Sequence, residues 1–117
     1  MAKLYKTSQS GAELIVDQLS LAEGFWRRGK GLLGTKSLAS NAALWIKPCN
    51  NIHTFFMNYA IDCVFIDKKL TIQNIVEAVP PFRFVGPFWK SHSVIEMSSG
   101  TVAAKNLRIG DHLYVVS

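Results

Sequence analysis

Hydrophobic and polar positions alternate in short runs along most of the chain. Such alternation is typical of strands that bury one face, because successive side chains of a strand point to opposite sides. Turn-forming residues separate the runs, as in the Ser-Gln-Ser-Gly cluster at 8–11. We therefore expect strands at residues 3–6, 13–16, 43–46, 53–57, 61–66, 70–79, 93–97 and 113–116.

Two of these runs lie in the most apolar part of the chain. In 53–57 we expect His53, Phe55 and Met57 to project to one side of a strand. The run at 61–66 is nearly continuous in apolar residues, which predicts a strand buried on both faces. A charged turn, Asp-Lys-Lys at 67–69, follows it.

Helical spacing is confined to short stretches. Leu19, Ala22 and Trp26 recur at helical intervals and Gly29 follows them as a stop signal, so a short helix is predicted at 19–30. One helical turn is predicted at 100–105. The prolines at 80 and 81 break the strand pattern and introduce an aromatic loop at 82–90.

Many short strands and little helix predict an α+β domain that is mainly β. The expected architecture is a small, mostly antiparallel barrel or sandwich with one or two short helices, since such a fold hides its strand edges. With 117 residues and no linker or repeat, the chain is long enough for a single domain, residues 1–117.

Charge and composition narrow the function classes. The formal net charge is +5, but the basic residues are dispersed except for Arg27, Arg28 and Lys30, which favours a solvated surface over a nucleic-acid track. The N-terminal sequence lacks an apolar signal region, and no apolar run approaches the length of a membrane span. We therefore expect a cytoplasmic protein with free thiols, and the sequence leaves open whether Cys49 and Cys63 ever pair.

Three segments together resemble a known family. They are RGKGLL at 28–33, PC at 48–49 with IHTFFM at 52–57 and ID at 61–62, and VIE at 94–96 with Gly100 and GD at 110–111. From about Leu19 to the C-terminus the chain resembles the bacterial and archaeal family known as domain of unknown function 192. That resemblance implies no particular chemistry, because the family is uncharacterised. Many members resemble secreted proteins with a leader sequence, from which this chain departs, and its Cys and His are similar to features of one subgroup.

Cys49, His53 and Asp62 supply the residue types of a thiol nucleophile, its base and an orienting acid. In an extended strand the Cys49 and His53 side chains would lie about 13 Å apart, whereas a hydrogen bond needs about 3 Å. Only a reversal at Asn50-Asn51 would join them, and Asn favours turns. A half-buried cysteine and a backbone-satisfied histidine are the simpler interpretation, so a Cys/His-dependent enzyme is the alternative hypothesis.

A soft-metal site is a second alternative. Cys49, His53 and Met57 would suit copper or zinc better than magnesium. Zinc usually takes about four ligands at recurrent spacings, and Cys63 lies in a core-like run. Met57 beside two phenylalanines is typical of core packing, so we expect no metal or other cofactor.

Asp62 and Glu96 each interrupt an apolar strand, where a charge needs a partner. Arg28 is the candidate partner of Asp62 in a buried ion pair. The same residues would equally suit a polar site at a barrel mouth that binds a small ligand.

Aromatic residues are interleaved with Arg83 and Lys90 in the loop at 82–90. Such a loop can stack bases and follow phosphates, or it can cap the core. No nucleic-acid-binding signature accompanies it, so the sequence favours the cap. We therefore expect a ligand- or partner-binding module for an unidentified small molecule or protein. Its predicted site residues are Arg28, His53, Asp62 and Glu96, with Arg83 and Trp89 at the rim.

Overall fold

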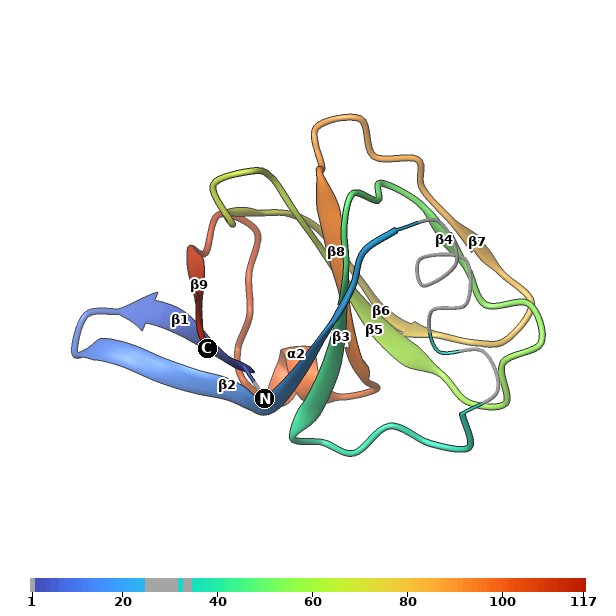
Figure 1. The fold of residues 1–117 in the computed structure, drawn as a ribbon, viewed down its shortest axis with the longest axis horizontal. Coiled ribbons are helices and arrows are strands. Elements are labelled where there is room, and N and C mark those ends of the chain that lie inside the picture. The colour runs from blue at the N-terminus through green and yellow to red at the C-terminus, as the bar shows by residue number, and fades with distance from the viewer. Residues whose placement is uncertain (1, 25–31, 33–34) are drawn as a thin grey trace.

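The computed structural model describes residues 2–24, 32 and 35–117, and within them strands dominate (Figure 1). The strands are β1 (Ala2–Ser8), β2 (Gly11–Ala22), β3 (Ala42–Ile46), β4 (Ile52–His53), β5 (Ile61–Ile66), β6 (Ile72–Val79), β7 (Phe84–Val85), β8 (Ser93–Ser98) and β9 (Leu113–Val116). One short helix, α2 (Thr101–Ala104), lies in the described ranges. No helix among these residues has the length and hydrophobicity to cross a membrane.

Seven strands form one mixed sheet in the order β6-β5-β8-β3-β2-β1-β9, and β4 and β7 form a separate two-stranded sheet. All pairs in the large sheet are antiparallel except β2 with β3. The predicted class, mainly β, is therefore confirmed, but the large sheet is not closed into a barrel. Its two edges meet at the isolated bridge between Thr71 and His112, where the N–H of Ile72 donates to the carbonyl of Asp111 and the N–H of Leu113 to that of Leu70.

The strand β5 separates two hydrophobic clusters. Val64 and Ile66 pack into the first cluster with β1, β2 and α2, while Cys63 and Phe65 pack into the second with the β4 and β7 segments. Because successive side chains of a strand point to opposite faces, burial on both sides requires a continuous apolar run. All six residues of β5 are buried, as the sequence predicts.

The predicted strand at 53–57 is wrong beyond His53. Strand β4 ends there, and Phe56 adopts a left-handed backbone with φ of 67° in a turn. As a result, Met57 is buried in the second cluster while His53 is exposed. The expected common face of His53, Phe55 and Met57 does not form because a turn, rather than a strand, connects them.

The predicted helix at 19–30 is also wrong at its start. Leu19–Ala22 continue β2, where they pair with β3 in parallel. Both Leu19 and Ala22 are buried, so their three-residue spacing reflects two packed positions of an irregular strand rather than a helix face. The remainder of that prediction, residues 25–30, lies outside the described residues.

Candidate functional site

Asp62 is completely buried, and its carboxylate holds three backbone amides. Oδ1 accepts the N–H of Ala78 at 2.8 Å, and Oδ2 accepts those of Gly100 and Val102 at 3.0 Å. Such charge-assisted bonds satisfy a buried carboxylate without a cation. The side chain thus holds the left-handed backbone of Ala78, where the β5–β6 pairing shifts register, and the start of α2. Its predicted partner Arg28 lies outside the described residues.

Glu96 is also buried, at 3% exposure, but its carboxyl group lacks comparable support. Oε1 has no hydrogen-bond partner in the described parts of the chain. Burial raises the pKa of Glu96 to about 7, because a low-dielectric environment disfavours the charged form. The sequence correctly singled out Glu96 as a buried acid, and its predicted ligand-binding role stays a prediction.

The three residues of the predicted thiol enzyme do not converge. Cys49 donates its S–H to the backbone oxygen of Asn51 at 2.8 Å, and the exposed His53 ring contacts the rings of Phe55 and Phe84. Asp62 directs both carboxylate oxygens to backbone amides rather than to His53. This arrangement lacks the hydrogen-bonded relay of base and orienting acid that activates a nucleophile.

A soft-metal site is not assembled either. Within the described ranges, no group of three or more His, Cys, Asp and Glu side chains is placed to hold a metal ion. Met57, the third predicted ligand beside Cys49 and His53, is buried in the second hydrophobic cluster. The buried Met57 and the exposed His53 thus lie in different environments.

A cluster of aromatic rings, all exposed except the half-buried Phe55, forms where β4 and β7 meet. We call the rings of His53, Phe55, Phe56, Phe82 and Phe84 the aromatic tip. Their centroids lie 4.7–6.4 Å apart, within the range of aromatic pairing. Ile52 and Val85 point inward to the second cluster, so strand alternation turns their neighbours His53 and Phe84 outward.

Thr54 holds the two halves of the aromatic tip together. This fully buried residue donates its hydroxyl to the carbonyl of Pro80 at 2.6 Å and accepts the N–H of Arg83 at 2.9 Å. Its own N–H donates to the carbonyl of Arg83 at 2.8 Å, and its carbonyl accepts the N–H of Phe82 at 3.0 Å. The sequence analysis missed Thr54, although a lone polar residue beside an aromatic run was a usable signal.

Trp89 and Arg83, predicted to form one rim, belong to different surfaces. Arg83 lies within the turn of the aromatic tip, whereas Trp89 borders a separate hollow of about 480 Å³. We call it the Trp89 hollow; its other lining residues are Asp67, Lys68, Lys69, Lys90, Ser91 and His92. The sequence missed this juxtaposition because it depends on how the β5–β6 turn meets the loop before β8.

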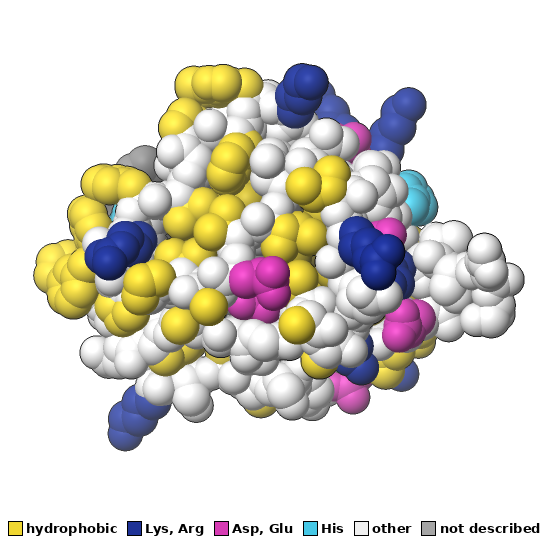
Figure 2. Space-filling model, turned by 180° about the vertical axis from the view of Figure 1, so that it is seen from behind, with side chains coloured by type: hydrophobic (Ala, Val, Ile, Leu, Met, Phe, Trp, Pro, Cys, Tyr) yellow, Lys and Arg dark blue, Asp and Glu magenta, His cyan; other side chains and the backbone are white. Residues whose placement is uncertain are grey.

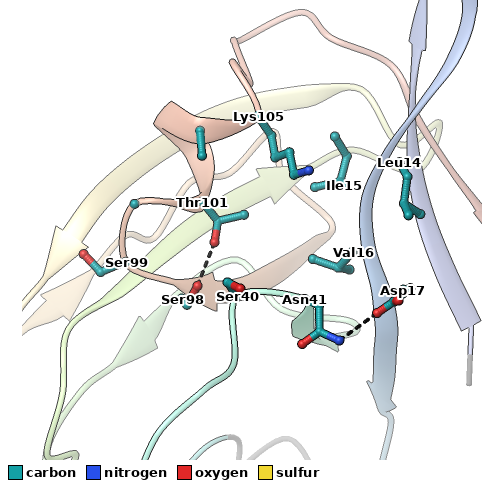
Figure 3. Close-up of a pocket in the computed structure, with 12 residues that line it drawn as sticks. Leu14, Ile15, Val16, Asp17, Ser40, Asn41, Ser98, Ser99, Thr101 and Lys105 are labelled. Atoms are coloured by element: carbon teal, nitrogen blue, oxygen red, sulfur yellow. Dashed lines mark hydrogen bonds between the residues drawn. The ribbon is translucent and has the colours of Figure 1, made fainter.

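A second hollow of about 470 Å³ opens between β2 and the start of α2 (Figure 3). Four of its seven polar side chains are paired with one another, Asn41 with Asp17 and Ser98 with Thr101. Such pairing leaves few polar groups to fix a ligand, so this hollow is the weaker candidate.

Comparison with known proteins identifies a matching family and a relative of the chain. The family model DUF192, described as Uncharacterized ACR, matches residues 6–115. A UPF0127 protein of Thermococcus sibiricus is 30% identical over 101 residues, which make up 82% of this chain and 64% of the relative. The chain thus spans less than two thirds of the length of that relative.

Two crystal structures are similar in fold. A protein of unknown function from Novosphingobium aromaticivorans has a TM-score of 0.83 and 18% identity, over 96% of this chain and 83% of its own. A protein of Sinorhizobium meliloti 1021, described as a candidate transcription regulator, has a TM-score of 0.84 and 20% identity, over 98% of this chain and 94% of its own. At these identities the likeness shows the fold alone. The family match over residues 6–115 carries the assignment: the chain belongs to the DUF192 family.

Proposed function

We propose that this domain is a binding module that docks onto an anionic lipid surface through the aromatic tip. The observation that carries the proposal is the exposure of three phenylalanines, which is 77% for Phe56, 61% for Phe82 and 74% for Phe84. Together they present on the order of 400 Å² of apolar surface, a size at which exposed patches usually have a function.

Backbone strain at the same residues supports the proposal. Phe56 and Phe82 have left-handed φ values of 67° and 64°. Such a conformation costs a bulky residue about 1 kcal/mol or more. Burial of these exposed rings does not offset that cost in the free protein, whereas contact of the rings with a partner surface would.

Charge and position favour a lipid surface as that partner. Residues 50–58 and 80–90 contain no acidic residue, and they include the basic Arg83 and Lys90. The net charge of +5 adds attraction to anionic headgroups. Strands β4 and β7 also lie toward one end of the longest molecular axis, so the tip can insert without a clash of the sheet (Figure 1). Hydrophobic side chains gather at that end in the opposite view (Figure 2).

The Cys/His-dependent enzyme remains the alternative function. It requires Cys49 and His53 to act together, yet the Cys49 thiol donates to Asn51 and the His53 ring packs against aromatic rings. A binding module needs no such relay, and it makes use of the exposed rings that an enzyme hypothesis leaves unexplained.

Vesicle flotation tests the proposal. The probes are vesicles of phosphatidylcholine alone and vesicles with about one quarter phosphatidylglycerol. We expect binding to the anionic vesicles only, and at least about tenfold weaker partitioning for the double variant Phe56→Ser, Phe84→Ser. The matched control is Leu14→Ser with Leu21→Ser, which removes two other exposed apolar side chains, at 40% and 42% exposure.

Two results would overturn the proposal. One is equal flotation of the wild type and the phenylalanine double variant. The other is no flotation of the wild type even at low salt, where electrostatic attraction is strongest. Far-UV circular dichroism of each variant verifies that the fold is retained.

A further inference from the structure

We infer that the Trp89 hollow is a second, independent site, which binds a phosphate ester that carries a planar base. Trp89 is 81% exposed, and Lys68, Lys69 and Lys90 line the same hollow. A base can stack on an indole face while lysine ammonium groups hold the phosphate. The shared chemistry is that of a nucleotide, whether free or within a single strand.

Ser91 provides an observation independent of the surface charges. This residue lines the hollow, is only 8% exposed, and its Oγ has no hydrogen-bond partner in the described portion of the chain. A buried hydroxyl without a partner loses its hydration without compensation. Because Ser91 lines the hollow, a ligand oxygen bound there is the candidate for the missing partner once the side chain turns toward it.

The electrostatic balance of the hollow favours an anion. Three lysines contribute +3 and Asp67 contributes −1, which leaves +2 with His92 neutral. Both Asp67 carboxylate oxygens are already engaged, by the N–H groups of Lys69 and Thr71 and by the side-chain amide of Gln73. The carboxylate therefore shapes the turn that carries Lys68 and Lys69, rather than facing an incoming phosphate as a free acceptor.

Backbone bonds fix the two halves of the hollow beside each other. The N–H of His92 donates to the carbonyl of Ile66 at 2.8 Å, which ties the loop before β8 to the end of β5. Cys49 donates its N–H to the carbonyl of His92 at 2.8 Å. Phe88, next to Trp89, packs its ring against the buried Phe65 at 4.8 Å between centroids. These contacts pre-organise the site, which lowers the entropic cost of binding.

The size of the hollow suits one nucleotide. A volume of about 480 Å³ lies within the range of small-molecule sites, about 300–1,000 Å³. Inorganic phosphate would leave most of this space and the indole face unused. We therefore expect adenosine monophosphate to bind more tightly than either inorganic phosphate or adenosine.

Titrations of the full chain test this inference, with the Trp89 indole N–H signal in NMR spectra as the reporter. The probes are inorganic phosphate, adenosine, adenosine monophosphate and a short single-stranded oligoadenylate. We expect saturable binding of the monophosphate. Binding should be about tenfold weaker in the double variant Lys68→Ala, Lys69→Ala and in Trp89→Ala, for which the Ser91 backbone N–H replaces the indole as the reporter. Tighter binding of the oligonucleotide, with a steeper salt dependence, would assign the site to single strands; equal affinity would assign it to free nucleotides.

Ser91→Ala distinguishes a ligand group from a structural one. Because the hydroxyl has no partner in the described structure, its removal should leave stability unchanged or raise it, while binding weakens several-fold. The matched control is Lys3→Ala with Lys36→Ala, two lysines outside the hollow, which should bind as the wild type does. Absence of saturation by the monophosphate, or equal affinity for it and inorganic phosphate, would overturn the inference. Neither result would bear on vesicle binding by the aromatic tip.

Discussion

Glu96 lies directly opposite Cys63 in the antiparallel pairing of β8 with β5. Directly paired residues of antiparallel strands project to the same face, so a carboxyl group and a thiol meet on the face of the second hydrophobic cluster. Burial, and then the nearby Glu96, Asp62 and Cys49, raise the pKa of Cys63 well above its ordinary range. Two predictions follow from this pair, one on how fold stability depends on pH and one on the reactivity of the Cys63 thiol.

The stability of the fold should decrease with pH because of Glu96. Its pKa is about 7 in the fold against 4.5 when unperturbed. Between these values the folded state keeps the proton and the unfolded state releases it, so stability falls as the pH rises from about 4.5 to about 7. The loss should reach about 3 kcal/mol above pH ~7. Urea unfolding across this range should show that Glu96→Gln lacks this component of the decline.

The control for this measurement is Glu77→Gln, which changes an exposed acid on β6. Its pH dependence should match that of the wild type. If Glu96→Gln also matched the wild type across the range, Glu96 would not carry the pH dependence.

Cys63 should resist alkylation in the folded protein, while Cys49 reacts. Cys63 is completely buried and protonated, and alkylation requires an accessible thiolate. Peptide mapping after iodoacetamide treatment, with and without urea, measures this difference. The pH profile of Cys49 alkylation should be unchanged in His53→Ala; a shifted profile would instead support the Cys/His-dependent enzyme.

Asp62→Asn should destabilise the fold strongly. The amide retains the shape of the side chain but loses the negative charge and turns an N–H₂ group toward backbone donors, so three charge-assisted bonds are weakened. We expect a loss of about 3 kcal/mol or more in chemical unfolding. Asp17→Asn is the control, because the Asp17 carboxylate accepts a bond from the exposed Asn41 side chain rather than from buried backbone amides, and it should lose less than about 1 kcal/mol. Similar losses for both would refute the anchoring role of Asp62.

Gly86→Ala should disturb the support of the aromatic tip. An added Cβ would lie 2.7 Å from the Asn50 carbonyl oxygen, and Gly86 has a left-handed φ of 93°. Gly110 has a similar φ of 95° but open space around the same position, so Gly110→Ala isolates the backbone strain. We expect a loss of about 1 kcal/mol at Gly110 and about 3 kcal/mol at Gly86. Equal thermal shifts would show that the close contact with Asn50 is relieved easily.

Thr54→Val should weaken both stability and vesicle binding. Valine matches the shape of threonine but leaves the carbonyl of Pro80 and the N–H of Arg83 without their side-chain partner. The expected loss is about 2 kcal/mol. Thr54→Ser keeps the hydroxyl and should retain vesicle binding. Vesicle flotation that is unchanged in Thr54→Val would separate the binding surface from this anchor.

The sequence predicted elements best where local pattern and tertiary packing agree. The run at 61–66 is nearly continuous because β5 is buried on both faces, and the clusters on its two sides account for every position except Asp62. The run at 53–57 has the same strand-like alternation, but Thr54 bonds to Pro80 and Arg83 and converts the segment into a turn. Contacts so distant in sequence leave no mark in a local pattern.

The candidate sites divide in the same way. Burial of Asp62 and Glu96 followed from their apolar neighbours, and both are buried. The sequence does not reveal which groups surround Asp62, because the amides of Gly100 and Val102 lie 38 and 40 residues away along the chain. Likewise, Lys68 and Trp89 were assigned to a turn and a loop, and only the sheet topology brings them to one hollow.

The pairing of β1 with both β2 and β9 bears on how the chain folds as it leaves the ribosome. The residues of β9 that pair with Lys3–Lys6, at 113–116, are synthesised more than 100 residues later. Until these emerge, β1 exposes an unpaired edge, and the ammonium group of Lys6 lacks the carbonyls of Lys105 and Asn106 that it binds in the fold. If the β1–β2 hairpin forms first, we expect the charged Lys6 at its open edge to discourage pairing with another nascent chain and so to reduce aggregation during synthesis.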